Sequence, residues 1–349
     1  MIKRVTLKHI AERANVSVST VSYALNDDST VALSEETRAR IRRIARDLGY
    51  VPNSMARALQ SSVSHTVGVL LDKPLSNPRY ARIAQGIRLG LNEYGYDLLL
   101  ADTDGEPQSE RYVDDARGGR IDGLIFVGHD ELRVDADLER AVRRYTIPFV
   151  TLDCGETTGD APFATVDFDY AGGVRQLVQA LTERGVDTVV YVRPDVTSRA
   201  ERLRESALLG AVTDAQATVT IVRTSATDQS IDELERRPSA DYGRQLVDRV
   251  QQALANGRPD PRRTAVVCSW GSDVEFAYVA ARRHDPHLLV GGLAGGTLSE
   301  WVWPNLFYSR LPLEEAGRAC ARLILEELTP GAEHRRVVLA PVLSGSDQP

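Results

Sequence analysis

The first fifty residues carry three short stretches in which apolar side chains recur every three to four positions. The first stretch begins at Thr6, and after a break at Asn15 the second runs from Val18 to Leu25. Ser17 is a suitable N-cap for this second helix, and Ser34 is a suitable N-cap for a third. The pattern predicts three short helices, the first two joined by a tight turn.

From residue 65 onward, short apolar runs alternate with amphipathic stretches. Runs such as Val67 to Leu71 and Gly123 to Val127 have the length of buried strands, while stretches such as Ile83 to Tyr94 have helical spacing. Strands that alternate with helices predict parallel sheets covered on both faces. The roughly 280 residues of this pattern suit two such sheets, and such folds bind ligands beyond the carboxyl ends of their strands.

The distribution of charge separates the two parts of the chain. Residues 1–64 contain ten Lys and Arg against six Asp and Glu, a balance of +4, whereas the whole chain carries −7 and the remainder therefore −11. A basic head on an acidic body is expected when only the head contacts phosphate, because counterion release depends on local positive charge.

Composition and motifs argue against several protein classes. Apolar residues make up 42% and charged residues 26%, as in ordinary folded proteins, and no apolar run is long enough for a membrane span or a signal peptide. The three cysteines are far apart, so neither a disulfide framework nor a metal site is indicated, and we expect no cofactor. The glycine run 291–296 departs from the dinucleotide-binding signature, and no catalytic motif is present, so we expect no enzyme.

The outward face of the second helix is suited to a DNA groove. This face carries Val18, Ser19, Ser22 and Tyr23, small residues near the N-terminus and then one long polar aromatic. In a helix-turn-helix the early residues of the recognition helix face base edges, while hydroxyls such as those of Thr20 and Ser22 can bind phosphates. A small three-helix domain with a solvated, serine-rich face is the alternative that these residues alone leave open.

Several N-terminal motifs together resemble the head-piece of the lactose-repressor (LacI/GalR) family. They are Val5 to Ala11, Val16 to Ser22, Asn26, Thr37-Arg38, Leu48-Gly49-Tyr50, Pro52-Asn53 and Ala56-Arg57-Ala58-Leu59. The resemblance implies a hinge helix, residues 53–60, that orders on operator DNA and pushes Leu59 into a minor-groove step. The DNA-binding residues it implies are Thr6, Val18, Ser19, Thr20, Ser22, Tyr23, Asn26, Ala56, Arg57 and Leu59.

The rest of the chain resembles the periplasmic-binding-protein-like core of the same family. The matching segments include Asn77-Pro78, Gly95-Tyr96, Asp122 to Ile125, Pro148 to Asp153 and Pro304-Asn305-Leu306. The fold expected is an α-helical head-piece followed by an α/β two-lobed (type 1) effector domain. We expect a DNA-binding domain at 1–52, a hinge and linker at 53–64 and an effector domain at 65–343. Its first lobe is expected near 65–165 and 289–312, and its second near 166–288 and 313–343.

In the family the effector lies between the lobes. The resemblance assigns Tyr80, Asp153, Arg202 and Asp273 to this pocket, and Trp270 is a further candidate because an aromatic at a strand end can stack on a flat ligand. Ala294 stands where relatives typically have a sugar-binding aspartate, and Glu205 stands where they tend to have glycine. A sugar bound in the usual way is therefore not expected.

These observations predict a cytoplasmic, nucleoid-associated transcriptional regulator, with repression as the expected action. It would bind a pseudo-palindromic operator as a homodimer and respond to a small molecule, a sugar or another metabolite, between its lobes. A DNA-binding regulator without an effector is the alternative. A secreted solute-binding protein built on the same core is opposed by the basic head and by the lack of a signal sequence.

Overall fold

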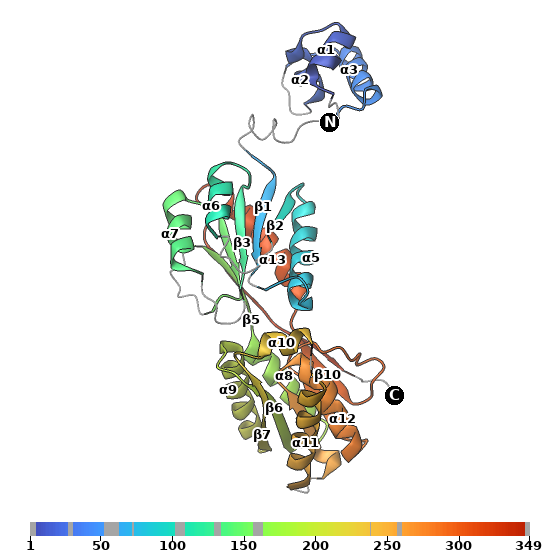
Figure 1. Cartoon of the computed structure of the whole chain (residues 1–349), viewed down its shortest axis with the longest axis vertical. Coiled ribbons are helices and arrows are strands. Elements are labelled where there is room, and N and C mark those ends of the chain that lie inside the picture. The colour runs from blue at the N-terminus through green and yellow to red at the C-terminus, as the bar shows by residue number, and fades with distance from the viewer. Residues whose placement is uncertain are drawn as a thin grey trace. The chain divides into compact units, whose positions relative to one another are not determined.

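The chain divides into two units, residues 1–64 and residues 65–349, which are described separately here. A computed structural model describes residues 5–26, 31–51, 63–71, 73–101, 109–128, 134–155, 163–237, 239–256 and 260–345. Figure 1 traces the helices and strands of both units. Among the described residues, no helix has the length and apolar character needed to cross a membrane.

The described residues of the first unit form three helices, as the sequence predicts. They are α1 (Leu7–Ala14), α2 (Val18–Leu25) and α3 (Glu35–Asp47). Ser17 Oγ accepts the Thr20 N–H at 3.0 Å and caps α2, and Ser34 Oγ accepts the Thr37 N–H at 3.2 Å and caps α3. The fully buried Ile10, Val21 and Ile41, one from each helix, form the centre of the core together with four buried alanines.

The described residues of the second unit form two sheets, which confirms the predicted α/β fold. The first sheet has the order β11-β5-β4-β3-β1-β2, and the second has the order β12-β10-β9-β8-β6-β7. All neighbouring strands are parallel except β10 and β12, which are antiparallel. The strands of the first sheet are β1 (Thr66–Leu71), β2 (Asp97–Ala101), β3 (Gly123–Val127), β4 (Phe149–Leu152), β5 (Ala164–Phe168) and β11 (Arg336–Leu339). Those of the second are β6 (Thr188–Asp195), β7 (Thr218–Thr227), β8 (Thr264–Cys268), β9 (Leu289–Gly292), β10 (Leu306–Arg310) and β12 (Val342–Gly345).

Helices cover both faces of each sheet (Figure 1). Those of the first sheet are α5 (Pro78–Asn92) and α13 (Leu313–Glu327) on one face, and α6 (Ser109–Arg117) and α7 (Ala136–Tyr145) on the other. Those of the second sheet are α8 (Tyr170–Thr182) and α9 (Arg199–Asp214) on one face, and α11 (Ala240–Asn256) and α12 (Val274–His284) on the other. The short helix α10 (Ile231–Arg236) follows β7.

Two glycines allow α5 and α13 to pack closely. A Cβ at Gly86 would lie 2.0 Å from the backbone oxygen of Glu314, and one at Gly317 would lie 2.2 Å from that of Ile83. A side chain at either position would push the helices apart. The C-terminal helix is thereby fixed to the first helix of this unit.

The expected division into lobes is wrong for the last part of the chain. Residues 289–310 belong to the second sheet, because β9 pairs with β8 and β10 pairs with β9. Residues 313–339 belong to the first, because α13 packs on α5 and β11 pairs with β5. An apolar run predicts a strand but does not show which sheet the strand joins. The two segments were therefore assigned to the wrong lobes. We call residues 65–168 with 313–339 the first lobe, and 169–310 with 342–345 the second.

Candidate functional site

The helix α2 presents one exposed face beside its buried one. Val18 and Tyr23 are 46% and 42% exposed, and Ser19 is also exposed, whereas Val21 and Ala24 are fully buried. The predicted base-reading side chains therefore share one accessible face, as a recognition helix requires.

The other predicted DNA-binding residues differ in how they are placed. Thr6 and Asn26 are exposed at helix ends, and Thr20 and Ser22 are half-buried. The Thr20 hydroxyl lies 2.8 Å from Ser17 Oγ, within the cap of α2. Ala56, Arg57 and Leu59, with the expected hinge helix, lie outside the described residues.

Two arginines of α3, neither of them predicted from the sequence to have this role, bind the C-terminal end of α2. Arg38 donates from Nη1 to the backbone oxygens of Tyr23 and Asn26, each at 3.4 Å. Arg42 donates from Nε to the Ala24 oxygen at 3.1 Å. Cations at a helix C-terminus donate hydrogen bonds to its last carbonyls and interact favourably with the helix dipole. These arginines therefore orient α2 as well as adding positive charge.

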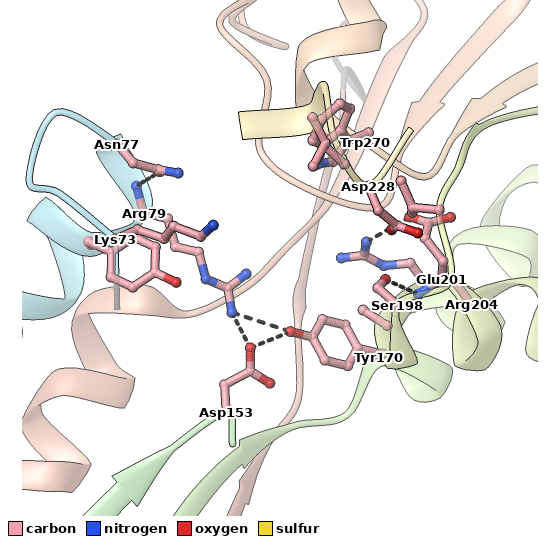
Figure 2. Close-up of a pocket in the computed structure, with 14 residues that line it drawn as sticks. Lys73, Asn77, Arg79, Asp153, Tyr170, Ser198, Glu201, Arg204, Asp228 and Trp270 are labelled. Carbon is pink, nitrogen blue, oxygen red and sulfur yellow. Dashed lines mark hydrogen bonds and ion pairs between the residues drawn. The ribbon is translucent and has the colours of Figure 1, made fainter. Parts of the chain in front are cut away.

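A cavity of about 280 Å³ lies between the two lobes of the second unit. Its walls are formed by the residues that follow strand ends and open helices, as expected for a doubly wound fold. Figure 2 shows Lys73 and Arg79 on one side and Glu201, Arg204 and Trp270 on the other. The lining residues are Lys73, Asn77, Arg79, Tyr80 and Asp153 from the first lobe, and Tyr170, Val196, Ser198, Ala200, Glu201, Arg204, Asp228, Ile231 and Trp270 from the second.

Asp153 is the best-connected carboxylate of this cavity. It follows β4, has a left-handed backbone (φ +54°) and is fully buried. Its Oδ2 accepts from Arg79 Nη2 at 2.5 Å and from the Tyr170 hydroxyl at 2.9 Å, and its Oδ1 accepts from Arg199 Nη2 at 3.3 Å. Burial by itself would lower the pKa of Arg79. The neighbouring Tyr170 and Asp153 outweigh this effect, so the pKa of Arg79 is raised.

The ion pairs continue from Asp153 through the boundary between the lobes. Arg199 Nη2 lies 3.5 Å from Oδ1 of Asp167, and Arg336 Nη2 lies 3.0 Å from its Oδ2. Burial raises the pKa of Asp167, and the two arginines only partly offset that effect. Arg199 belongs to the second lobe and both aspartates to the first, so one guanidinium bridges the lobes.

A second polar cluster supports the cavity from the second lobe. Arg204 Nη1 lies 3.4 Å from Glu201 Oε1, its Nη2 donates to the Leu293 oxygen at 3.3 Å, and its guanidinium lies 4.8 Å from the centre of the Tyr170 ring. Arg193 Nε lies 4.0 Å from Glu201 Oε2, and Arg193 Nη1 pairs with Glu205. The carboxylates of this cluster are therefore next to guanidinium groups.

Three of the five predicted pocket residues line the cavity. They are Tyr80, whose hydroxyl donates to the Gly128 oxygen at 3.2 Å, Asp153 and Trp270. Arg202 does not line it, because its side chain is exposed on α9 and donates to the Thr197 oxygen at 2.7 Å.

Asp273 also lies outside the lining. It is fully buried beside α12 and accepts from the Tyr242 hydroxyl at 2.6 Å. Burial raises the pKa of Asp273 to about 7, although the hydrogen bond from Tyr242 opposes the change.

Most of the charged residues around the cavity were not predicted from the sequence. They are Lys73, Arg79, Arg199, Glu201, Arg204 and Asp228. Arg79 could have been found from its place directly after the Asn77-Pro78 start of a helix, where the first turn faces a strand end. Among the described residues, no group of His, Cys, Asp and Glu is arranged to hold a metal ion.

Comparisons with known proteins match both units. The family described as bacterial regulatory proteins, lacI family, matches residues 6–53, and the family described as periplasmic binding proteins and sugar binding domain of LacI family matches residues 64–207. Catabolite control protein A of Staphylococcus xylosus is 27% identical over 207 residues, which cover 59% of this chain and 60% of that protein. The match thus spans less than two thirds of this relative's length.

Solved structures show the same fold over nearly the whole chain. The Lac repressor dimer bound to operator and the anti-inducer ONPF has a TM-score of 0.72 at 20% identity, covering 97% of this chain and 98% of its own. The complex of the transcriptional regulator CelR with cellobiose has a TM-score of 0.60 at 23% identity, covering 98% of each chain.

Proposed function

The chain belongs to the lacI family of bacterial regulatory proteins, and from this premise we propose that it is a ligand-controlled, DNA-binding transcriptional regulator, with repression as its action. The observation that carries the proposal is the exposed face of α2, with Val18, Ser19 and Tyr23 accessible together on a basic unit. The relatives reported above are regulators, and no catalytic step is proposed.

On operator DNA, α2 acts as the recognition helix. Val18, Ser19 and Tyr23 meet base edges in the major groove, and the hydroxyls of Thr20 and Ser22 face phosphates together with Thr6 and Asn26. Arg38 and Arg42 keep α2 at a fixed angle through its C-terminal carbonyls. The hinge segment, with Ala56, Arg57 and Leu59, contacts the minor groove.

The regulator binds its operator as a homodimer. A pseudo-palindromic operator with half-sites about one helical turn apart matches a two-fold protein that presents two copies of α2. Trp301 and Val302, exposed 72% and 73%, are the most exposed large apolar side chains described in the second lobe, and we place a dimer contact there. A protein that acts on operator DNA works in the cytoplasm, at the nucleoid.

A small molecule in the cavity between the lobes controls DNA binding. Because the cavity walls come from both lobes, a ligand contacts both and favours the lobe arrangement to which it binds more tightly. Asp153, Tyr80 and Trp270 are the predicted residues that the cavity places in reach of such a ligand. Either sign of control, induction or corepression, is compatible with this mechanism.

A regulator without an effector is the second candidate, and one observation favours it. Asp153 has three protein partners, Arg79, Tyr170 and Arg199. A network that is satisfied in this way could hold the lobes in a single arrangement. Ligand titration separates the two candidates.

The test is operator selection from a random DNA duplex library with the purified chain, with and without pools of small metabolites. Recovery of a palindrome supports the DNA-binding function, and a change in its retention with one pool supports ligand control. A variant carrying Val18→Ala and Tyr23→Ala is the matched control, because it keeps the helix and its cap but removes the base-reading side chains. Enrichment of the same site by this variant, or of no site by the wild-type chain, would contradict the proposal.

A further inference from the structure

We propose that Asp273 is a positioning residue for the cavity between the lobes: in its protonated form it holds the turn that carries Trp270, and loss of the proton displaces that turn. The inference rests on the proposed function, because it concerns the regulation of that same cavity. Asp273 is not among the lining residues, so it acts through Trp270, which is one of them. Ligand binding therefore weakens as the pH rises, and the proton becomes a second input to the regulator.

Asp273 and Trp270 lie at the two ends of one tight turn. The 3-10 turn Gly271–Asp273 leads from Trp270 into α12. The Asp273 N–H donates to the Trp270 oxygen at 3.3 Å, which joins the two residues through the backbone. A Cβ at Gly271 would lie 2.2 Å from the backbone oxygen of Gly295, so the turn is packed closely against a neighbouring segment. A shift of Asp273 therefore also moves the turn and Trp270.

Trp270 connects this turn to the cavity. It is half-buried, packs against the apolar core of the second lobe and also lines the cavity. Figure 2 shows it on the side of the cavity that the second lobe forms. An aromatic ring in such a wall can stack on a flat face of a ligand, so its position affects ligand binding directly.

The carboxyl group of Asp273 is buried without a counter-charge. Its Oδ1 accepts from the Tyr242 hydroxyl at 2.6 Å, and its Oδ2 is buried without a hydrogen bond to any described group. The other described carboxyl groups that are buried each pair with an arginine; they are Asp153, Asp167, Glu201 and Glu300. A buried carboxylate with one hydrogen bond and no cation is costly, so these surroundings favour the neutral acid.

The titratable groups that act on Asp273 from the described elements around it are neutral or negative. They are Tyr242 on α11, Cys268 at the end of β8 and Glu201 on α9. Burial raises the pKa of Tyr242 and that of Cys268, so both stay neutral near pH 7. Burial also raises the pKa of Asp273 to about 7, the hydrogen bond from Tyr242 opposes this change, and the charge of Glu201 adds to it. Asp273 therefore loses its proton within the physiological range.

Ionisation of Asp273 changes the wall of the cavity. A charge in an apolar, cation-free site has to be compensated by water or by movement of the group toward water. Either response loosens the turn Gly271–Asp273, and the backbone bond to Trp270 transmits the change. At low pH the ring stays packed in the wall, and above the transition it becomes more accessible to solvent.

Trp270 can report this transition without a ligand. The chain has three tryptophans, so Trp301→Phe and Trp303→Phe leave Trp270 as the single tryptophan of the full-length chain. Its emission, and the quenching of that emission by acrylamide, are measured from about pH 5 to about pH 9 at constant ionic strength. We expect both to change with a midpoint near pH 7, with stronger quenching on the alkaline side.

Variants in this background identify the group that titrates. Asp273→Asn keeps the shape of the side chain and removes its charge, so emission and quenching should stay at their low-pH values throughout. Asp248→Asn, at an exposed position on α11, is the matched control and should keep the midpoint near pH 7. Tyr242→Phe removes the hydrogen bond that favours the carboxylate, so it should raise the midpoint by about one pH unit.

The Tyr242→Phe variant also keeps the inference testable if Asp273→Asn fails to fold, because loss of packing alone would not raise the midpoint. The inference is overturned if Trp270 shows no transition in this pH range, if Asp273→Asn shows the same transition as its background, or if Tyr242→Phe leaves the midpoint unchanged or lowers it. The titration needs neither operator nor metabolite. Its failure therefore leaves the DNA-binding function untouched, and failure of operator selection is recognised separately.

Discussion

Asp153 and Arg199 form an ion pair of 3.3 Å between residues that belong to different lobes. Both side chains are buried, and Arg199 also reaches Asp167 at 3.5 Å, so one guanidinium from α9 is held by two carboxylates of the first lobe. Because the pair lies next to the cavity, any movement of α9 relative to β4 that accompanies ligand binding would change it. The pair is thus placed to couple occupancy of the cavity to the arrangement of the lobes.

Replacing Arg199 with Met should destabilise the second unit. The variant removes one partner of a buried ion pair, which leaves Asp153 and Asp167 with less compensation, and such losses reach about 3 kcal/mol. The measurement is the free energy of unfolding in urea. The control is Arg202→Met, on the exposed face of the same helix. It should change the free energy of unfolding by less than about 0.5 kcal/mol. Similar values for the two variants would show that Arg199 does not hold the lobes.

The helices of the first unit could be predicted from sequence because their signals are local. Ser17 and Ser34 cap their helices as expected, and the buried residues Ile10 and Val21 lie at the predicted apolar positions. A cap and a periodic apolar face are both set by residues a few positions apart, so one sequence contains the whole signal.

The charged residues around the cavity could not be predicted in the same way. On α9 the buried residues include Arg199, Glu201 and Arg204, while Arg202 is exposed, so polarity does not mark the buried face of this helix. The family resemblance pointed to Arg202. The partners that allow the other charges to be buried, such as Asp153, are distant in sequence and meet them only in the folded chain.

Asp273 should make stability depend on pH. Its pKa of about 7 in the folded chain is above the ordinary value of 3.8, so the folded state holds the proton more tightly than the unfolded state does. The stability it contributes is fully present below pH 4 and is lost as the pH rises through 7. Asp273→Asn should therefore be more stable than the wild type at pH 8, on the order of 2 kcal/mol, and similar to it near pH 4.

The check on Asp273 is a series of urea unfolding curves between pH 4 and 8. Asp248→Asn, at an exposed position on α11, provides the control for removing one carboxylate. If the free energies of unfolding of the wild type and of Asp273→Asn differ by the same amount at every pH from 4 to 8, Asp273 does not titrate in this range.

Trp301→Ser should weaken the proposed dimer. Removing an exposed indole from an association surface lowers the apolar area that two copies can bury, and we expect the dimer dissociation constant to rise at least about tenfold. Sedimentation equilibrium measures the constant. Tyr94→Ser removes a 61% exposed aromatic from the first lobe and should leave the constant unchanged; if Tyr94→Ser instead has the larger effect, the dimer contact lies elsewhere.

Leu59→Ala and Tyr23→Ala should both weaken specific operator binding while leaving nonspecific binding largely intact. Tyr23 is expected to meet a base edge and Leu59 to enter a base step, and loss of either contact should reduce specific affinity by about 1–3 kcal/mol. Phosphate contacts remain in both variants, so binding to random DNA and its dependence on salt should stay close to those of the wild type.

Fluorescence anisotropy with the selected operator and with a scrambled duplex, each at several salt concentrations, separates the two kinds of binding. Arg42→Gln is the informative companion variant, because it removes the bond from α3 to the Ala24 oxygen without touching the exposed face of α2. If orientation of α2 matters, this variant also loses specific affinity, and its loss should be smaller once Tyr23→Ala is already present, since a misplaced helix has no base contact left to lose. Additive losses in the double variant would instead mean that Arg42 acts on the DNA directly, as one more phosphate contact, and not through the position of the recognition helix.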